Sequence, residues 1–172
     1  EETLVVRMTM NVPHELPDGG FWCVLTVDEV PDPEAASAGV GVKFLASVST
    51  GIFLYTGDVR RAASILDMKV ESEAAVITVR NEGNAPIGVE GRVEFLAEGA
   101  KGEPTSMPLA RTTVLTEPVT QGVLTAALPA ASVLPSGRYR VRVILDFGAD
   151  HLIGAEREIE IVRGIRSNGP GR

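Results

Sequence analysis

The sequence predicts an all-β protein built as two consecutive antiparallel β-sandwich modules, of which the first is incomplete. Three observations lead to this prediction. Apolar residues alternate with polar residues along almost every apolar segment, which is the period of a strand with one buried face. Almost no segment has the spacing of an amphipathic helix. Clusters of Gly, Pro, Asn and Asp separate the alternating segments, as turn residues do between antiparallel strands.

Three alternating segments form the predicted first module. They cover residues 4–10, residues 21–27 and, as the longest, residues 40–55. One face of the longest segment carries Val42, Phe44, Ala46, Val48, Ile52 and Leu54. The predicted turns between the segments contain Asn11–Pro13, Pro17–Gly20 and Pro31–Pro33.

The second module is predicted to contain a complete set of strands. They are residues 65–70, 74–80, 87–96, 111–115, 120–128, 138–147 and 152–162. Seven short strands within about one hundred residues are typical of an immunoglobulin-like sandwich. The fold class is therefore all-β, with two immunoglobulin-like antiparallel β-sandwich modules, the first of them incomplete.

The segment 138–147 has the clearest alternation. Its inward residues are Tyr139, Val141, Val143, Leu145 and Phe147, and its outward residues include Arg138, Arg140, Arg142 and Asp146. Because the turn Leu134–Gly137 precedes it, Tyr139 is a candidate for a structural tyrosine-corner hydrogen bond. In the last segment, Arg157 interrupts the inward set and predicts a bulge or a strand end.

The domain boundary is placed near residues 55–62. The first module then covers residues 1–57, the second covers residues 58–163, and residues 164–172 form a flexible Gly- and Pro-rich tail. The charged segment Asp58–Arg61 is the predicted hinge.

Composition excludes several classes of partner and cofactor. The formal net charge is −7 and the pI is about 4.9, so no basic stripe is available for nucleic acid. No apolar run reaches the ~20 residues that span a bilayer. The single cysteine, Cys23, excludes an internal disulfide and is interpreted as a small core side chain. No cofactor is expected.

The sequence offers no set of catalytic residues. His14 and His151 each lie in loop-like sequence beside an acid, which indicates solvated turns and not a metal pair. No nucleophile elbow and no phosphate-binding glycine motif is present. We therefore expect a protein that is not an enzyme.

Two other groups of residues have two interpretations each. Glu156, Glu158 and Glu160 share one strand face, which suits either a calcium site or, with more weight, a solvated face of like charges. Trp22 and Tyr55 suit either a carbohydrate-stacking platform or core positions, and Trp22 beside Phe21 in an alternating strand favours the core.

Residues 3 to about 57 resemble the PapD-like pilus chaperones of the bacterial periplasm. Thr3–Met8 is similar to the strand that enters the second half of that family's first domain. Leu16–Pro31 is similar to the domain's penultimate strand, with a Leu-Pro turn, an aromatic pair and an acid-hydrophobe-proline end. Val40–Tyr55 is similar to its long last strand, which ends at a tyrosine before the hinge.

The resemblance implies a chaperone-like, protein-binding function in the bacterial envelope, in the periplasm or at the cell surface. In that family the last strand of the first domain pairs with an incomplete pilus subunit. By position, the partner-binding residues here are Val42, Phe44, Ala46 and Val48. The partner is a protein subunit or a second copy of this chain. The other interpretation is that these residues face the core of their own module.

This sequence departs from the family's pattern in two places. The family's lysine in the last strand is replaced by Gly51-Ile52-Phe53, and Lys43 lies too early to substitute for it. The first strand of the family, which carries a second basic residue, has no counterpart here. We expect another segment or another chain to supply the opening strands. The alternative function is a structural or adhesive sandwich module of a larger surface protein.

Overall fold

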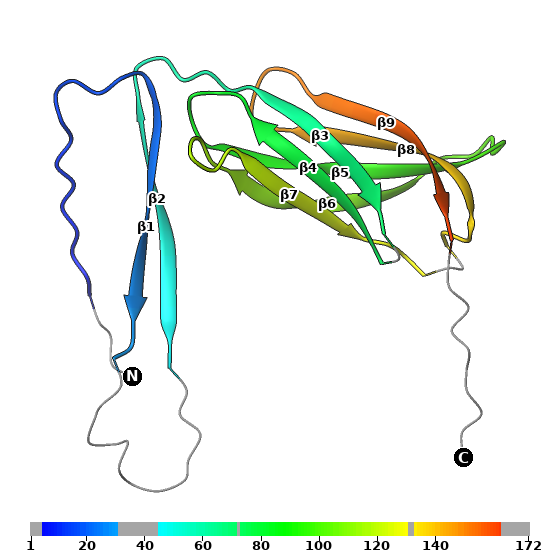
Figure 1. Ribbon diagram of the computed structural model, residues 1–172, viewed down its shortest axis with the longest axis horizontal. Helices are drawn as coiled ribbons and strands as arrows, with labels where there is room; N and C mark the ends of the chain where they lie inside the picture. Colours follow the sequence, from blue (N-terminus) through cyan, green and yellow to red (C-terminus); the bar gives the residue numbers. More distant parts are fainter. Residues whose placement is uncertain (1–4, 31–44, 72, 131–132, 163–172) are drawn as a thin grey trace, which may run out of the picture.

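The computed structural model describes residues 5–30, 45–71, 73–130 and 133–162, and within these ranges the chain forms strands and no helix (Figure 1). The all-β, antiparallel prediction is confirmed. The strands are β1 (Gly19–Asp28), β2 (Ser47–Thr56), β3 (Ala63–Val70), β4 (Ala74–Asn81), β5 (Ile87–Ala97), β6 (Thr105–Val114), β7 (Gln121–Ala127), β8 (Gly137–Asp146) and β9 (Ile153–Ile161). No helix long and apolar enough to cross a membrane occurs in these ranges.

Strands β3 to β9 form a two-layer sandwich. One sheet has the order β3-β4-β7 and the other has the order β6-β5-β8-β9. The flanks are closed because β6 lies beside β7 and β3 lies beside β9. Of these seven strands, three form one sheet and four form the other, and β6 is hydrogen-bonded to β5.

The sandwich core comes from the alternating residues of both sheets. The five inward side chains predicted for residues 138–147 are all buried, four of them in β8 and Phe147 directly after it, and the arginines of β8 are exposed. These residues meet a second set from the opposite sheet and from the β5–β6 pair. That set contains Ala75, Ile77, Val79, Val89, Val93, Phe95 and Leu124. Period-two burial across two facing sheets is what produces a single continuous core.

The hydroxyl of Tyr139 donates a hydrogen bond to the carbonyl oxygen of Pro135 at 2.9 Å, which confirms the predicted tyrosine corner. The prediction for Arg157 is wrong, because β9 pairs with β8 without a register shift and Arg157 lies opposite Val141. Arg157 instead reaches β3, where its Nη1 donates to the Met68 carbonyl oxygen at 3.0 Å. A bulge does occur in β3, at the register shift between Ile65 and Asp67.

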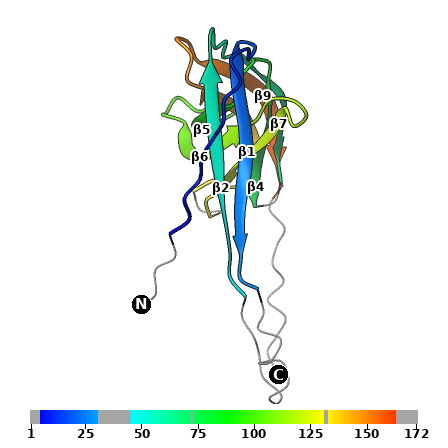
Figure 2. The ribbon, with the colours of Figure 1, turned by 90° about the vertical axis from the view of Figure 1, so that its left-hand side faces the viewer.

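Strands β1 and β2 form a separate two-stranded sheet, called here the hairpin. They pair antiparallel from Gly19–Thr56 to Asp28–Ser47 without a register shift. The hairpin projects from one end of the sandwich and runs across its long axis, as Figures 1 and 2 show. The segments expected to precede and extend it differ from prediction. Residues 5–10 are exposed and form no strand, and residues 40–44 lie outside the described residues.

Two core assignments in the first module are also wrong. Cys23 is exposed and not a core side chain. Trp22 is only half-buried. Both lie on the hairpin, which has no second sheet packed on it among the described residues. Alternation in the sequence was thus a correct signal for a strand but not for a covered face.

Candidate functional site

The hairpin is the most distinctive surface of the molecule because both of its faces are apolar. Residues that pair across an antiparallel ladder share a face. One face, called the aliphatic face, carries Phe21, Cys23, Leu25, Val27, Val48, Ile52 and Leu54. The opposite face, called the aromatic face, carries Trp22, Val24, Phe53 and Tyr55. A strand of an ordinary one-sided sheet would have a polar outer face instead.

Many of these side chains are exposed. On the aliphatic face, Val48 is 69% exposed, and Phe21 and Val27 are exposed as well. On the aromatic face, Val24, Phe53 and Tyr55 are exposed. Apolar residues that cluster in this way on a solvent-exposed surface are typical of an interaction site.

Each strand of the hairpin also has one unpaired edge. Within the described residues, β1 pairs only with β2 and β2 pairs only with β1. The N–H and C=O groups that alternate along the outer side of each strand therefore lack a ladder partner. Such an edge can accept another strand through main-chain hydrogen bonds.

The four partner-binding residues predicted from the sequence divide into two groups. Ala46 and Val48 are described, and both are exposed at the distal end of the hairpin. Val48 lies opposite Val27, and the carbonyl oxygen of Ala46 accepts a hydrogen bond from the Glu29 N–H at 2.9 Å. Val42 and Phe44 lie outside the described residues.

Polar cross-strand contacts hold the distal end of the hairpin. The hydroxyls of Thr26 and Ser49 share a hydrogen bond of 2.9 Å, and the Ser47 hydroxyl donates to the Asp28 carboxylate. The hairpin therefore changes from apolar near the sandwich to polar near its end, where Val27 and Val48 lie between the polar pairs Thr26–Ser49 and Asp28–Ser47.

Gly51 gives the aromatic face its shape. A Cβ at this position would lie 3.0 Å from Cε2 of Phe53, which is closer than ordinary packing allows. The absence of a side chain lets the Phe53 ring lie along the strand. Gly51 lies opposite Val24 in an unbroken register, so it relieves crowding and marks no bulge.

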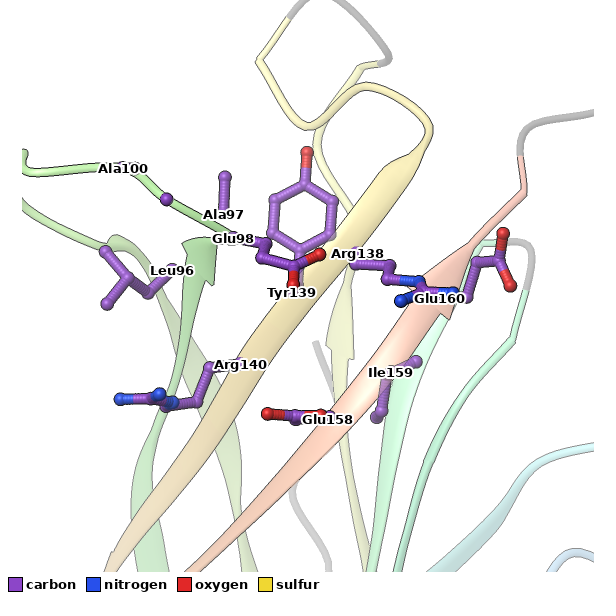
Figure 3. A pocket seen from close by; sticks show the side chains of 11 residues that line it. Leu96, Ala97, Glu98, Ala100, Arg138, Tyr139, Arg140, Glu158, Ile159 and Glu160 are labelled. Atoms are coloured by element: carbon purple, nitrogen blue, oxygen red, sulfur yellow. The ribbon is translucent and has the colours of Figure 1, made fainter.

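A second candidate is a hollow of about 380 Å³ on the outer face of the four-stranded sheet (Figure 3). Its charged lining consists of Glu98, Arg138, Arg140, Glu158 and Glu160, and Leu96 adds an apolar side chain. Figure 3 shows these side chains on β8, β9 and the end of β5. The lining carries both charge signs and neither histidine nor cysteine, so it offers carboxylate and guanidinium groups for ion pairing.

The acidic row on β9 is part of a cross-strand charge pattern. Glu156, Glu158 and Glu160 lie opposite Arg142, Arg140 and Arg138 of β8. Arg142 Nη2 lies 3.0 Å from Glu156 Oε2, and Arg140 Nε lies 3.5 Å from Glu156 Oε1. Within the described residues, no three potential ligands gather as a metal site would require. The row therefore lies opposite arginines of its neighbouring strand, and Glu156 forms ion pairs with two of them.

The histidines lie apart from both candidates. His151 is exposed in the turn between β8 and β9, where Nδ1 lies 2.8 Å from Asp150 Oδ1. The hydrogen bond from His151 lowers the pKa of the Asp150 carboxyl. His14 is exposed in the segment before β1. These are the solvated turn positions that the sequence predicted.

Sequence reasoning missed one group of contacts around Asn84, in the turn between β4 and β5. Its side chain and backbone bond to both the start of the hairpin and the segment after β2. The only signal in the sequence was a Gly- and Asn-rich turn, which has many structural explanations. The contacts join residues that are far apart in the chain, so no local pattern shows them.

The comparisons with known proteins identify no family for this chain. No family model matches it, and no curated protein matches it. Among solved structures, it is similar to a Se-Met labelled β-glucosidase from Kluyveromyces marxianus, with 16% sequence identity and a TM-score of 0.38. The match covers 64% of this chain and 15% of the β-glucosidase chain. The chain thus spans a small part of that enzyme, and a likeness of this size carries no argument about function.

Proposed function

We propose that the protein acts by binding other proteins through β-strand addition at the hairpin, without catalysis. One observation carries the proposal: a two-stranded sheet, whose two outer edges are unpaired among the residues that the structure describes, bears exposed apolar side chains on both faces. The resemblance of residues 3–57 to PapD-like pilus chaperones supports a chaperone-like role in surface assembly in the bacterial envelope, in the periplasm or at the cell surface.

The thermodynamic argument rests on the marginal stability of a lone hairpin. An isolated two-stranded sheet is barely stable in water, and three or more strands with a covered face are needed for independent stability. An added strand supplies main-chain hydrogen bonds to an unpaired edge, and its side chains cover apolar area worth about 25 cal/mol per Å². Binding and completion of the sheet are therefore the same event.

The chemistry of the hairpin also limits the partner. A strand laid along β2 places successive side chains on the aliphatic and aromatic faces in turn. A matching strand is apolar at most positions, uncharged at its centre and free of proline, since proline lacks a ladder donor. The strand β2 itself, Ser47–Thr56, is uncharged, lacks proline and is apolar at Val48 and throughout residues 52–55, so a second copy of this chain is a suitable partner.

The first test replaces Val48 by lysine. Because Val48 is exposed, Val48→Lys leaves the fold intact, but it places an ammonium group where a partner strand would cover it. The probe is a labelled synthetic peptide with the sequence Ser47–Thr56, measured by fluorescence anisotropy. We expect the dissociation constant to rise at least about tenfold, equivalent to ~1.4 kcal/mol.

Val123→Lys is the matched control, since Val123 is also an exposed valine in a strand but lies on β7 of the sandwich. It should bind the peptide as the unmodified chain does. Equal affinity of the Val48→Lys variant and the control, with both melting normally, would show that the hairpin is not the binding surface.

A further inference from the structure

Three chain segments meet at the turn Asn81–Pro86, which connects β4 of one sheet to β5 of the other. The first segment is the start of β1, and the second is the connection 57–62 between β2 and β3. The turn therefore lies where the hairpin and the sandwich join.

Asn84 bonds to both of the other segments. Its Nδ2 donates to the carbonyl oxygens of Asp18 at 3.2 Å and Asp58 at 3.0 Å. Its Oδ1 accepts from the Arg60 N–H at 2.7 Å. Its backbone carbonyl accepts from the Gly20 N–H at 2.8 Å, and its N–H donates to the Arg60 carbonyl oxygen at 3.1 Å. One residue thus uses every polar group it has, backbone and side chain, to link the two parts.

Asn81 fixes the turn from the sandwich side. Its side chain is buried, with the residue only 3% exposed. Nδ2 donates to the Ala85 carbonyl oxygen at 2.8 Å and lies 3.2 Å from the carbonyl oxygen of Val114. Oδ1 accepts from the Gly83 N–H at 2.9 Å. A buried amide with its partners in place rigidifies the backbone around it.

Close packing completes the junction. A Cβ on Gly20 would lie 2.5 Å from Cδ of Pro86 and 2.7 Å from Cβ of Ala85, both of which are buried. A Cβ on Gly83 would lie 2.3 Å from the Arg60 carbonyl oxygen. Only glycine lets these backbones approach so closely.

From these contacts we infer that Asn84 is a positioning residue that locks the hairpin at one orientation on the sandwich. The segment Asp58–Arg61 was expected from the sequence to be a hinge, yet the connection 57–62 that contains it is bonded to the turn through its backbone at Arg60 and Ala62. Rotation of the hairpin about this connection requires the loss of the Asn84 hydrogen bonds together. This inference concerns orientation and does not depend on the partner that the hairpin binds.

The test measures the distance between the hairpin and the sandwich with two spin labels. The single native cysteine, Cys23, is exposed on β1 and accepts one label. Lys101→Cys accepts the other in the exposed turn between β5 and β6. Double electron–electron resonance then gives the distribution of distances. For the otherwise unmodified chain we expect one narrow distribution.

Two variants weaken the junction from opposite sides. Asn84→Ala removes the side-chain bonds on the sandwich side, and Gly20→Ala introduces the clash with Pro86 on the hairpin side. Each should broaden the distribution or shift its mean while the sandwich melts as before. Gly102→Ala is the matched control, because a Cβ there meets nothing within 4 Å, and it should change nothing.

A broad distribution in the unmodified chain would overturn the inference. So would a narrow, unshifted distribution in Asn84→Ala when its sandwich melts as before. If Asn84→Ala unfolds the sandwich, Gly20→Ala alone decides the outcome, because its added methyl group perturbs the junction without removing a sandwich hydrogen bond.

Discussion

Asn81 and Asn84 lie three residues apart in one turn and make different kinds of contact. Asn81 is buried and bonds within the sandwich, whereas Asn84 is half-buried and bonds to the segments on either side of the hairpin. Asparagine suits both positions because its amide supplies two donors and an acceptor in one compact group. The same residue type therefore stabilises the sandwich at one position and connects it to the hairpin at the other.

Val143 tests the core at the residue scale. Its side chain is fully buried, with 0% exposed, at the centre of β8. Val143→Ala should lower the free energy of unfolding by about 1–3 kcal/mol through lost burial and a residual cavity. Chemical denaturation of the sandwich transition measures this value. Val162→Ala, at an exposed valine after β9, is the control and should have little effect. A neutral Val143→Ala would mean that this face of β8 is not core.

Asp67 and Lys69 provide a test of pH dependence on β3. Lys69 Nζ lies 2.9 Å from Asp67 Oδ2, and its hydrogen bond lowers the pKa of Asp67 and raises the pKa of Lys69. Because the folded pKa of Asp67 is depressed, its contribution to stability is present above the unfolded pKa of about 3.9 and is lost as the pH falls through the folded value. Lys69→Ala should move the pKa of Asp67 upward in an NMR titration. An unchanged pKa of Asp67 in this variant would show that Lys69 does not cause the lowered value.

At the scale of single strands, the alternation of apolar and polar residues predicts which side chains are buried only where a second sheet covers one face of the strand. Strand β8 satisfies this condition, and its burial follows the sequence residue by residue. Residues 5–10 alternate as regularly but form no strand, because alternation does not supply a pairing partner. The same reason explains why Cys23 and Trp22 were placed in a core that the described residues do not build.

Strand β6 shows a second limit of sequence reasoning. The sequence predicted a short strand, 111–115, but β6 covers Thr105–Val114. Pro108 falls inside this range and argues against a central strand. Because β6 is the edge strand of its sheet, the missing N–H of proline is tolerated. Which strand occupies an edge depends on long-range pairing and could not be inferred from local composition.

The candidate site was partly predictable for a similar reason. The sequence predicted the strand that contains Val48 and the resemblance implied a role in pairing for it, but neither showed that both faces of the hairpin are exposed. The exposure of a strand face depends on whether another segment of the chain packs on it, and this is a long-range property of the fold. The Asn84 junction lay beyond prediction because it joins residues as much as 66 positions apart.

In the whole molecule, the hairpin and the sandwich differ in how they are stabilised. The sandwich has one continuous core, whereas the hairpin is held by its own ladder and by the junction at its base. Local stability follows buried contacts. Amide exchange should therefore be faster in the hairpin than in β4, β5 and β8, and fastest toward Asp28 and Ser47, far from Gly20. Hydrogen–deuterium exchange measures this gradient. Uniform protection of the hairpin and the sandwich would contradict it.

The central claim is that the hairpin binds proteins by accepting a strand at an edge. Residue-resolved amide exchange by NMR, with and without the Ser47–Thr56 peptide, tests it most directly. Strand addition should protect alternate amides along β1 or β2, because only every second N–H points to the new strand. Val48→Lys should reduce this protection at a fixed peptide concentration. Binding of the peptide with protection confined to the sandwich, or no protection of the hairpin at saturating peptide, would contradict the account.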